Sequence, residues 1–522
     1  MEIYHNGKIY LNDDMAGTAE AMTVEDGVIT AVGSDDLILG KASPGGDVVD
    51  LKGCLVMPGF VDSHMHLLEY ALEKSFVDLT GASDLNDLLS LLRARLPEAE
   101  ASGMTLNGTG FNQNYWDKPE LPTRADLDSV SENVPIIVRR TCHHVTVANS
   151  PALRLAGLED SHRDGILREN DQYILDNALP APTKDQIKRL IADAALDLAS
   201  KGITQVQTDD LLVISSELFG KTVLDAYMEL DREGLLPVRV YEQCNLPSME
   251  RLEAFLGAGY MTGMSTGHFT IGPLKLLGDG ALGARSAALK NGYRDDPANH
   301  GFLNFSDDEL NQLVSAAHKA GMQIAIHGIG DRCIQQIIDV CENALREYPR
   351  PDHRHGIVHC QITHPEDLRR MADLGMIAYI QPVFLKADQH IVEDRVGPEL
   401  TASSYHWRAM KDLGIHMSGG SDCPIEPFDT LPNMYYAATC RQPGAEHAWH
   451  PEKALRMDEV FRLFTSEGAY ASFSENTHGR LVPGYAADFT VIDRDISSLP
   501  PKSLTEASVI MTFVDGRMIY SK

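Results

Sequence analysis

The sequence predicts an α/β protein whose main body is a (β/α)8, or TIM, barrel. We also expect a small β-sandwich domain built from both termini and an insertion after the first barrel strand. Short apolar runs alternate with helical segments through the middle of the chain, as in a parallel α/β sheet. The two ends share a different pattern of alternating strands and glycine turns, and the first two barrel runs lie much further apart than the others.

Eight apolar runs that end in polar residues are the candidate barrel strands. They begin at Gly59, Gly202, Leu236, Phe269, Met322, Arg354, Gly375 and Gly414. Eight parallel strands with alternating helices form a closed barrel, and its active site is built at the C-terminal ends of the strands. We therefore expect the barrel in residues 58–70 and 196–478 and the insertion in residues 71–195.

The chain ends carry the signature of antiparallel strands. AMTVEDGVITAVG near the start and ASVIMTFVDGRMIY near the end both alternate apolar and polar residues around an Asp-Gly turn. Residues 1–57 and 479–522 are therefore predicted to form one small β-domain together.

Composition excludes several classes of partner. Asp and Glu outnumber Lys and Arg by 75 to 45, and the net charge of -30 repels nucleic acid and anionic membranes. The eight cysteines are scattered without a CxxC pair, as expected in a reduced compartment, and the start lacks the pattern of a signal peptide. These features predict a cytoplasmic protein with a small-molecule substrate and no nucleic-acid or membrane partner.

The stretch GFVDSHMHL is the first candidate for a functional site. His64 and His66 are two residues apart on a strand, so their side chains project to the same face and could share a metal ion. Taken alone, such a pair is more often an ordinary polar strand end. Ligand types recur at later strand ends, at Lys275, His327, His359 and Asp422. Each of these could be a solvated, capping or core residue, but together on one rim they favour a metal centre.

At these residues the sequence resembles the amidohydrolase superfamily, in particular its YtcJ-like branch (amidohydrolase 3), which includes N-substituted formamide deformylases. The resemblance covers nearly the whole chain through PGFVDSHMH, GHFTIGPLKLLGDGALGARSAAL, IAIHGIGD, GIVHC, GGSDCPIEP and LVPGYAADFTVID. In the insertion, HRDGILRE and RRTCHHVTVANSPAL resemble branch motifs, with His144 and Asn149 at matching places. Cys142 and His143 stand where the branch more often has Asp-Gly, which leaves the substrate preference open.

The resemblance implies a ligand set for divalent metal, with zinc the expected ion. His64, His66 and Asp422 would hold one ion, His327 and His359 a second, and Lys275 carboxylated by CO₂ would bridge them. A carbamate supplies anionic oxygens, whereas a free ammonium repels a cation. A one-metal site with Lys275 unmodified is the alternative. The resemblance also implies an oligomer, for which we expect a homodimer.

The predicted reaction is hydrolysis of a C–N bond outside peptides, in an amide or N-substituted formamide. A divalent metal lowers the pKa of bound water from 15.7 to about 7, and Asp422 would act as general acid and base. A deaminase or lactone hydrolase on the same metal site is the alternative. A catalytically silent regulatory or binding protein on the same scaffold is a third hypothesis.

Candidate substrate contacts lie around the predicted centre, and each has a structural alternative. Arg285 could clamp a carboxylate or carbonyl, or form a surface ion pair. Aromatic residues could wall an apolar pocket or simply pack. The predicted contacts are Arg285, His144, Trp116 and Gln381, with Tyr115, Tyr293 and Phe384 as further wall residues.

Overall fold

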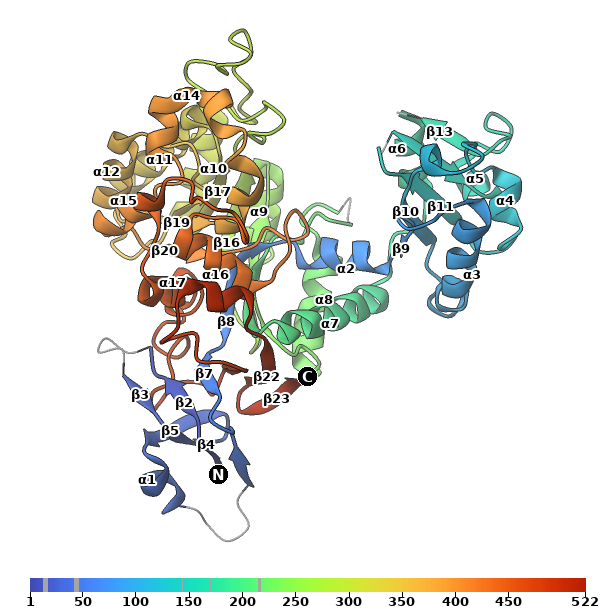
Figure 1. Ribbon diagram of the computed structural model, residues 1–522. Coiled ribbons are helices and arrows are strands. Elements are labelled where there is room, and N and C mark those ends of the chain that lie inside the picture. The colour runs from blue at the N-terminus through green and yellow to red at the C-terminus, as the bar shows by residue number, and fades with distance from the viewer. Residues whose placement is uncertain (13–16, 42–46, 143, 169, 215–216) are drawn as a thin grey trace. The chain divides into compact units, whose positions relative to one another are not determined.

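The computed structural model describes residues 1–12, 17–41, 47–142, 144–168, 170–214 and 217–522 (Figure 1). The chain divides into two compact units, the first made of Met1–Leu67 and Ala192–Lys522 and the second of Leu68–Ile191. Helices α2 (Leu67–Ser75) and α7 (Lys184–Ser200) contain the two points where the chain passes between the units. The second unit spans most of the segment expected as the insertion, 71–195.

The first unit contains the predicted barrel. In its described residues, eight strands form one sheet in chain order, and each neighbouring pair is parallel. Every candidate run overlaps one of them, so the predicted barrel is confirmed. The strands are β8 (Phe60–Met65), β14 (Ile203–Thr208), β15 (Arg239–Asn245), β16 (Phe269–Leu277), β17 (Ile324–Gly328), β18 (Gly356–His359), β19 (Ile377–Ile380) and β20 (Met417–Gly419).

Helices between the strands cover the outside of the sheet, which explains why every residue of β8 and β14 is buried. Helix α11 has a continuous apolar stripe at helical spacing, with Ile334, Ile337, Ile338 and Cys341 buried. The described helices of the barrel are α8 (Lys221–Arg232), α9 (Met249–Gly257), α10 (Asp307–Lys319), α11 (Asp331–Glu347), α12 (Pro365–Leu374), α13 (Leu385–Asp388), α14 (Val392–Ser403), α15 (Trp407–Asp412), α16 (Thr430–Thr439), α17 (Met457–Leu463) and α18 (Ser466–Ala471). Among the residues that the structure describes, no helix is both long and apolar enough to cross a bilayer.

The barrel closes between its first strand and the loop that follows its last. The backbone N–H of Asp422 donates to the carbonyl of His64 over 2.8 Å, and the N–H of His66 donates to the carbonyl of Cys423 over 2.8 Å. At Gly420 the two segments are so close that a Cβ atom would lie 2.7 Å from the backbone nitrogen of His64. Only glycine fits there without moving one segment away from the other.

Both termini build the β-domain beside the barrel in the first unit, as predicted. Strand β7, just before the first barrel strand, pairs antiparallel with β21 near the C-terminus. Tyr4, Phe489 and Phe513 form the aromatic centre, with the two phenylalanine rings stacked 4.3 Å apart. One sheet contains β1 (Glu2–His5), β4 (Ala21–Glu25), β5 (Val28–Gly33) and β6 (Asp47–Asp50), with the short helix α1 (Asp35–Leu39); the other contains β2 (Lys8–Tyr10), β3 (Thr18–Ala19), β7 (Leu55–Pro58), β21 (Phe489–Ile492), β22 (Val509–Val514) and β23 (Arg517–Ser521).

The second unit has its own sheet and its own core. Its apolar centre includes Leu88, Leu92, Phe111, Trp116 and Val138. The described strands are β9 (Val77–Asp78), β10 (Leu106–Phe111), β11 (Ile136–Arg140), β12 (Val145–Ala148) and β13 (Ile166–Arg168), and the helices are α3 (Leu85–Ser102), α4 (Arg124–Asp128), α5 (Ser150–Ala156) and α6 (Asn170–Ala178).

The close approach at Gly420 makes a testable prediction. Gly420→Ala should lower the free energy of unfolding by about 1–3 kcal/mol, because the added methyl group overpacks the contact with β8. Urea unfolding measures this, and Gly257→Ala on α9 is the control because a Cβ there meets no atom within 4 Å. Equal stability of the two variants would contradict the prediction.

Candidate metal centre

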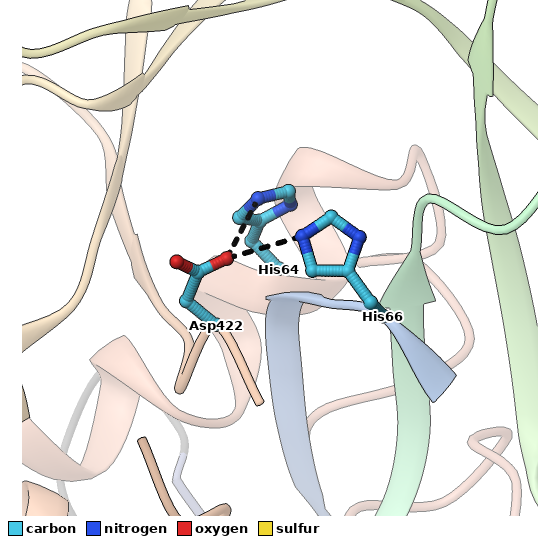
Figure 2. A group of neighbouring side chains, drawn as sticks. All are labelled: His64, His66 and Asp422. Atoms are coloured by element: carbon cyan, nitrogen blue, oxygen red, sulfur yellow. Dashed lines mark ion pairs between the residues drawn. The ribbon is translucent and has the colours of Figure 1, made fainter. Parts of the chain in front are cut away.

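His64, His66 and Asp422 meet at the closure of the barrel (Figure 2). The Nε2 atoms of His64 and His66 lie 3.3 and 3.4 Å from the same carboxylate oxygen, Oδ1 of Asp422. One ligand atom from each residue can be chosen so that all lie within 4.8 Å of one another, a spacing that can hold one metal ion. His64 and Asp422 are buried, and His66 is partly exposed.

The other predicted ligands stand on the neighbouring strand ends. The ring centroids of His327, on β17, and His359, on β18, are 4.5 Å apart, and that of His359 is 5.6 Å from that of His64. Lys275 on β16 is fully buried, and its Nζ lies 3.1 Å from Oδ2 of Asp209. The structure therefore brings the six side chains predicted as ligands to the same end of the barrel.

Each of the four histidines has an oxygen atom close to its Nδ1 atom. Three of these contacts are hydrogen bonds, and the fourth, between His327 and Asp279, is an ion-pair contact without hydrogen-bond geometry. All four oxygens come from a strand other than the histidine's own, or from the loop that follows that other strand. With Nδ1 occupied in this way, Nε2 is the atom that each ring has left for a metal, an arrangement typical of histidine ligands. The Nδ1 contacts are His64 to Oε1 of Gln243 (2.8 Å), His66 to the carbonyl of Asp209 (3.1 Å), His359 to Oε1 of Gln381 (2.7 Å) and His327 to Oδ1 of Asp279 (3.0 Å).

Asp279 is itself held tightly in place. Its Oδ2 accepts the backbone N–H groups of Ala288 (2.9 Å) and Gly330 (2.8 Å), and its Oδ1 accepts that of Ile329 (3.1 Å). These contacts fix the carboxylate beside the His327 ring. Gln243, Asp209 and Asp279 are not among the predicted site residues, although each lies at or just after the C-terminal end of a barrel strand, where the other candidates were found.

The pKa values of His64, His359 and Asp422 favour the protonation states that bind a cation. Burial and the charge of Lys275 lower the pKa of His64 to about 4, and burial and the charge of His327 hold the pKa of His359 well below its ordinary value. Burial disfavours the Asp422 carboxylate, but its contacts with the His64 and His66 rings outweigh burial and keep its pKa well below the ordinary value. Two neutral imidazoles and an anionic carboxylate are the protonation states that metal binding requires.

His66 is the exception, since its ring is protonated at neutral pH without a cation. Burial lowers its pKa, but the hydrogen bond to Asp422 and the charges of Asp209 and Asp422 raise it more, to about 9. That proton lies between two ligand atoms, so a metal ion would displace it.

Two of these residues also have an uncommon backbone conformation. His359 and Asp422 have φ angles of 73° and 60°, in the left-handed region that non-glycine residues rarely adopt. Such strain costs about 1–3 kcal/mol per residue and is concentrated at functional sites. The turn directs both side chains where a regular strand end would not.

The predicted substrate contacts of the barrel have the following contacts within the protein. Gln381 is buried and accepts from His359, so it orients a candidate ligand. Arg285 forms an exposed ion pair with Asp295 at 2.8 Å, which is the alternative that the sequence left open. Tyr293 is buried and donates to the carbonyl of Ala287, whereas the Phe384 ring stacks on His359 at 5.6 Å.

The remaining predicted contacts belong to the second unit. Trp116 is only 6% exposed, and its Nε1 donates to the carbonyl of Ala82 over 2.8 Å, so this side chain packs in the core of its unit. Tyr115 is 86% exposed, and His144 is exposed just before β12. His143 lies outside the described residues.

Comparison with known proteins agrees with this arrangement. A family model described as "Amidohydrolase family" matches residues 47–520. This chain belongs to the amidohydrolase family. "Putative amidohydrolase YtcJ" of Bacillus subtilis is 28% identical over 100% of this chain and 99% of its own length. The "N-substituted formamide deformylase" of Arthrobacter pascens is 26% identical over 99% of this chain and 98% of its own. The resemblance inferred from the motifs is thus confirmed.

Two further relatives bear on function. The "Exoenzymes regulatory protein AepA" of Pectobacterium carotovorum is 30% identical over 73% of this chain and 84% of its own. The crystal structure of an uncharacterized metal-dependent hydrolase from Pyrococcus horikoshii has a TM-score of 0.78 and 27% identity, covering 96% of this chain and 99% of that one. The family of this amidohydrolase and its structural neighbour support a hydrolase that uses a divalent metal.

The histidine acceptors allow a test that does not depend on any substrate. Gln243→Leu should weaken metal binding about 10–100-fold, because His64 loses the partner that holds Nε2 toward Asp422. Competition against a chelator measures the affinity. Gln207→Leu is the matched control, since Gln207 is equally buried but donates to the carbonyl of Gly468. Equal metal affinity in the two variants would show that the Gln243 contact does not orient a ligand.

Proposed function

We propose that this amidohydrolase cleaves the C–N bond of an amide or N-substituted formamide that is not a peptide, with a divalent metal at the barrel mouth. The observation that carries the proposal is the cluster of His64, His66 and Asp422, whose ligand atoms lie within 4.8 Å of one another. The full-length similarity to a protein named as an N-substituted formamide deformylase favours this bond class.

The donor atoms fit zinc or a similar ion. Imidazole nitrogen and carboxylate oxygen are ligands that zinc commonly takes in hydrolytic sites. His64, His66 and Asp422 would hold one ion, and His327 and His359 would hold a second if two are present. Lys275, buried beside Asp209, would join them only after carboxylation, since its ammonium would repel a cation. Native mass spectrometry of the metal-loaded protein would detect the added CO₂.

In this proposal, Asp422 carries out the proton transfer that accompanies cleavage. A divalent ion at this site supplies Lewis acidity and lowers the pKa of water to about 7. Oδ1 of Asp422 faces both histidines, whereas Oδ2 points away from the two rings (Figure 2). We assign to this carboxylate the transfer of a proton from the attacking water to the leaving nitrogen, which an amine needs in order to depart.

Two other hypotheses use the same scaffold. A deaminase or a lactone hydrolase needs the same activated water and differs only in the atom that leaves. A silent regulatory protein is the hypothesis that the similarity to the regulatory protein AepA favours. The presence of six candidate ligands at one end of the barrel, with an oxygen close to Nδ1 of each histidine, argues for catalysis.

Asp422→Asn tests the proton transfer. The variant should lose about 10²–10⁴-fold in kcat, because the amide cannot accept the proton. The assay is amine release from a panel of N-substituted formamides and acylated amines, with metal content measured on the same samples. Asp373→Asn, an exposed carboxylate on α12, is the control. Full activity of Asp422→Asn would refute the assigned role.

Metal removal tests the cofactor. Dialysis against a chelator should abolish turnover, and adding back zinc should restore it, because the activated water depends on the ion. Turnover by a protein that contains no metal would overturn the proposal.

The identity of the released product separates the chemical alternatives. We expect an amine and a carboxylate or formate, detected by amine-reactive labelling. Ammonia from a cyclic amidine would identify a deaminase, and acid release from a lactone without any amine would identify a lactonase. A metal-loaded protein that turned over none of these compounds would favour the silent hypothesis.

A further inference from the structure

A small pocket adjoins the candidate centre at the C-terminal end of the barrel. Its volume is about 220 Å³, and it is built from the loops that follow β16 to β20. Phe384, one of its lining residues, stacks on the ring of His359 with 16° between the planes. The lining residues are Ala281, Leu282, Gly283, Ile329, Gln361, Phe384, Ala387, Asp388, Ile425 and Glu426.

The pocket combines an apolar wall with a group of oxygen acceptors. Leu282, Ile329, Phe384 and Ile425 supply the apolar part. A volume of about 220 Å³ is below the roughly 300–1,000 Å³ of pockets that hold a whole ligand. The pocket is therefore sized for one substituent of a substrate.

Two carboxylates lie in this pocket. Oδ2 of Asp388 accepts from the Tyr405 hydroxyl over 2.7 Å and from Nε2 of Gln361 over 3.4 Å. Both contacts fall on the same oxygen, which leaves Oδ1 for a ligand. Oε2 of Glu426 pairs with Lys386, whose side chain is 53% exposed.

The side chain of Gln361 gives evidence for a bound ligand that is independent of the two carboxylates. Its side chain is only 3% exposed, and Nε2 is used by Asp388. Oε1 has no hydrogen-bond partner within the described part of the chain. Buried amide oxygens are almost always paired, so an unpaired one in a pocket wall indicates a donor that binds there.

The charges favour a cation as that donor. Burial raises the pKa of Asp388, and the nearby negative charge of Glu426 raises it further. A positive group between the two carboxylates would relieve this repulsion. An ammonium group offers three N–H donors and no acceptor, which matches a pocket that presents acceptors.

We propose that this pocket binds a protonated primary amine carried by the substrate, with Asp388, Glu426 and Oε1 of Gln361 as its acceptors. The inference rests on the proposed function. It narrows the substrate class to amides that carry, on a short apolar chain, a positively charged amino group in addition to the amide nitrogen. The methylenes of that chain contact Phe384 and Leu282, and the scissile bond lies toward the metal ligands.

A matched series of substrates tests the proposal. N-formyl diamines of increasing chain length are each compared with the N-formyl alkylamine in which methyl replaces the ammonium group. A third series carries a carboxylate at that position. At the best chain length, kcat/KM for the diamine should exceed that of the neutral compound by about tenfold or more, and the anionic compound should be the poorest.

Substitutions of the two carboxylates test whether this pocket causes the preference for cationic substrates. Asp388→Asn and Glu426→Gln should each lower the ratio of kcat/KM between the cationic and neutral substrates, mainly through KM for the cation. Asp373→Asn is the control and should leave the ratio unchanged. The recorded ion pair of Glu426 is with the half-exposed Lys386, so Glu426→Gln keeps the test valid if Asp388→Asn does not fold.

Calorimetry of the binding of free diamines and alkylamines to the metal-loaded protein distinguishes failure of the pocket assignment from failure of the proposed function. If neutral and cationic amides are hydrolysed equally and diamines do not bind, the pocket assignment fails and the proposed function stands. If no amide is hydrolysed but diamines bind in a manner that Asp388→Asn abolishes, the proposed function fails and the pocket assignment stands.

Discussion

The candidate centre depends on two backbone hydrogen bonds that join the ends of the barrel. Through them, Asp422 donates to the carbonyl of His64, and His66 donates to the carbonyl of Cys423. The buried carboxylate of Asp62 strengthens the same junction, since its Oδ1 accepts the backbone N–H groups of His64 and Ser421. The first strand and the loop after the last strand thus place the two histidines and the aspartate together.

Around this junction, the barrel fixes the direction of each ring. The acceptors at Nδ1 come from strand ends or the residues just after them, and three of the four lie in a part of the chain well separated from the histidine that they hold. Rigid strands hold such contacts more precisely than loops can. The left-handed backbone at His359 and Asp422 is tolerated because the neighbouring strands fix both ends of each turn.

Predictions from the sequence succeeded where the signal is local. The alternation and spacing of apolar residues located the barrel strands, and the polar residues at their ends included the side chains that meet at the mouth. The substrate contacts stay predictions. In the sequence, an arginine after a strand looks the same whether it faces a ligand or forms an ion pair, as Arg285 does with Asp295. A tryptophan in a polar segment likewise looks the same whether it lines a pocket or packs in a core, as Trp116 does. Gln243, within β15, and Asp279, just after β16, carried no signal beyond their place near the end of a strand.

By itself, the sequence determined the barrel, its β-domain and the candidate ligands, because strand periodicity and residue type are properties of short segments. The tertiary structure alone decided which nitrogen each histidine offers and which carboxylates surround it. It also decided that Gln361, Asp388 and Glu426 share one pocket. These features depend on contacts such as that between His64 and Gln243, which are 179 residues apart. Only closure of the barrel brings such residues within hydrogen-bonding distance.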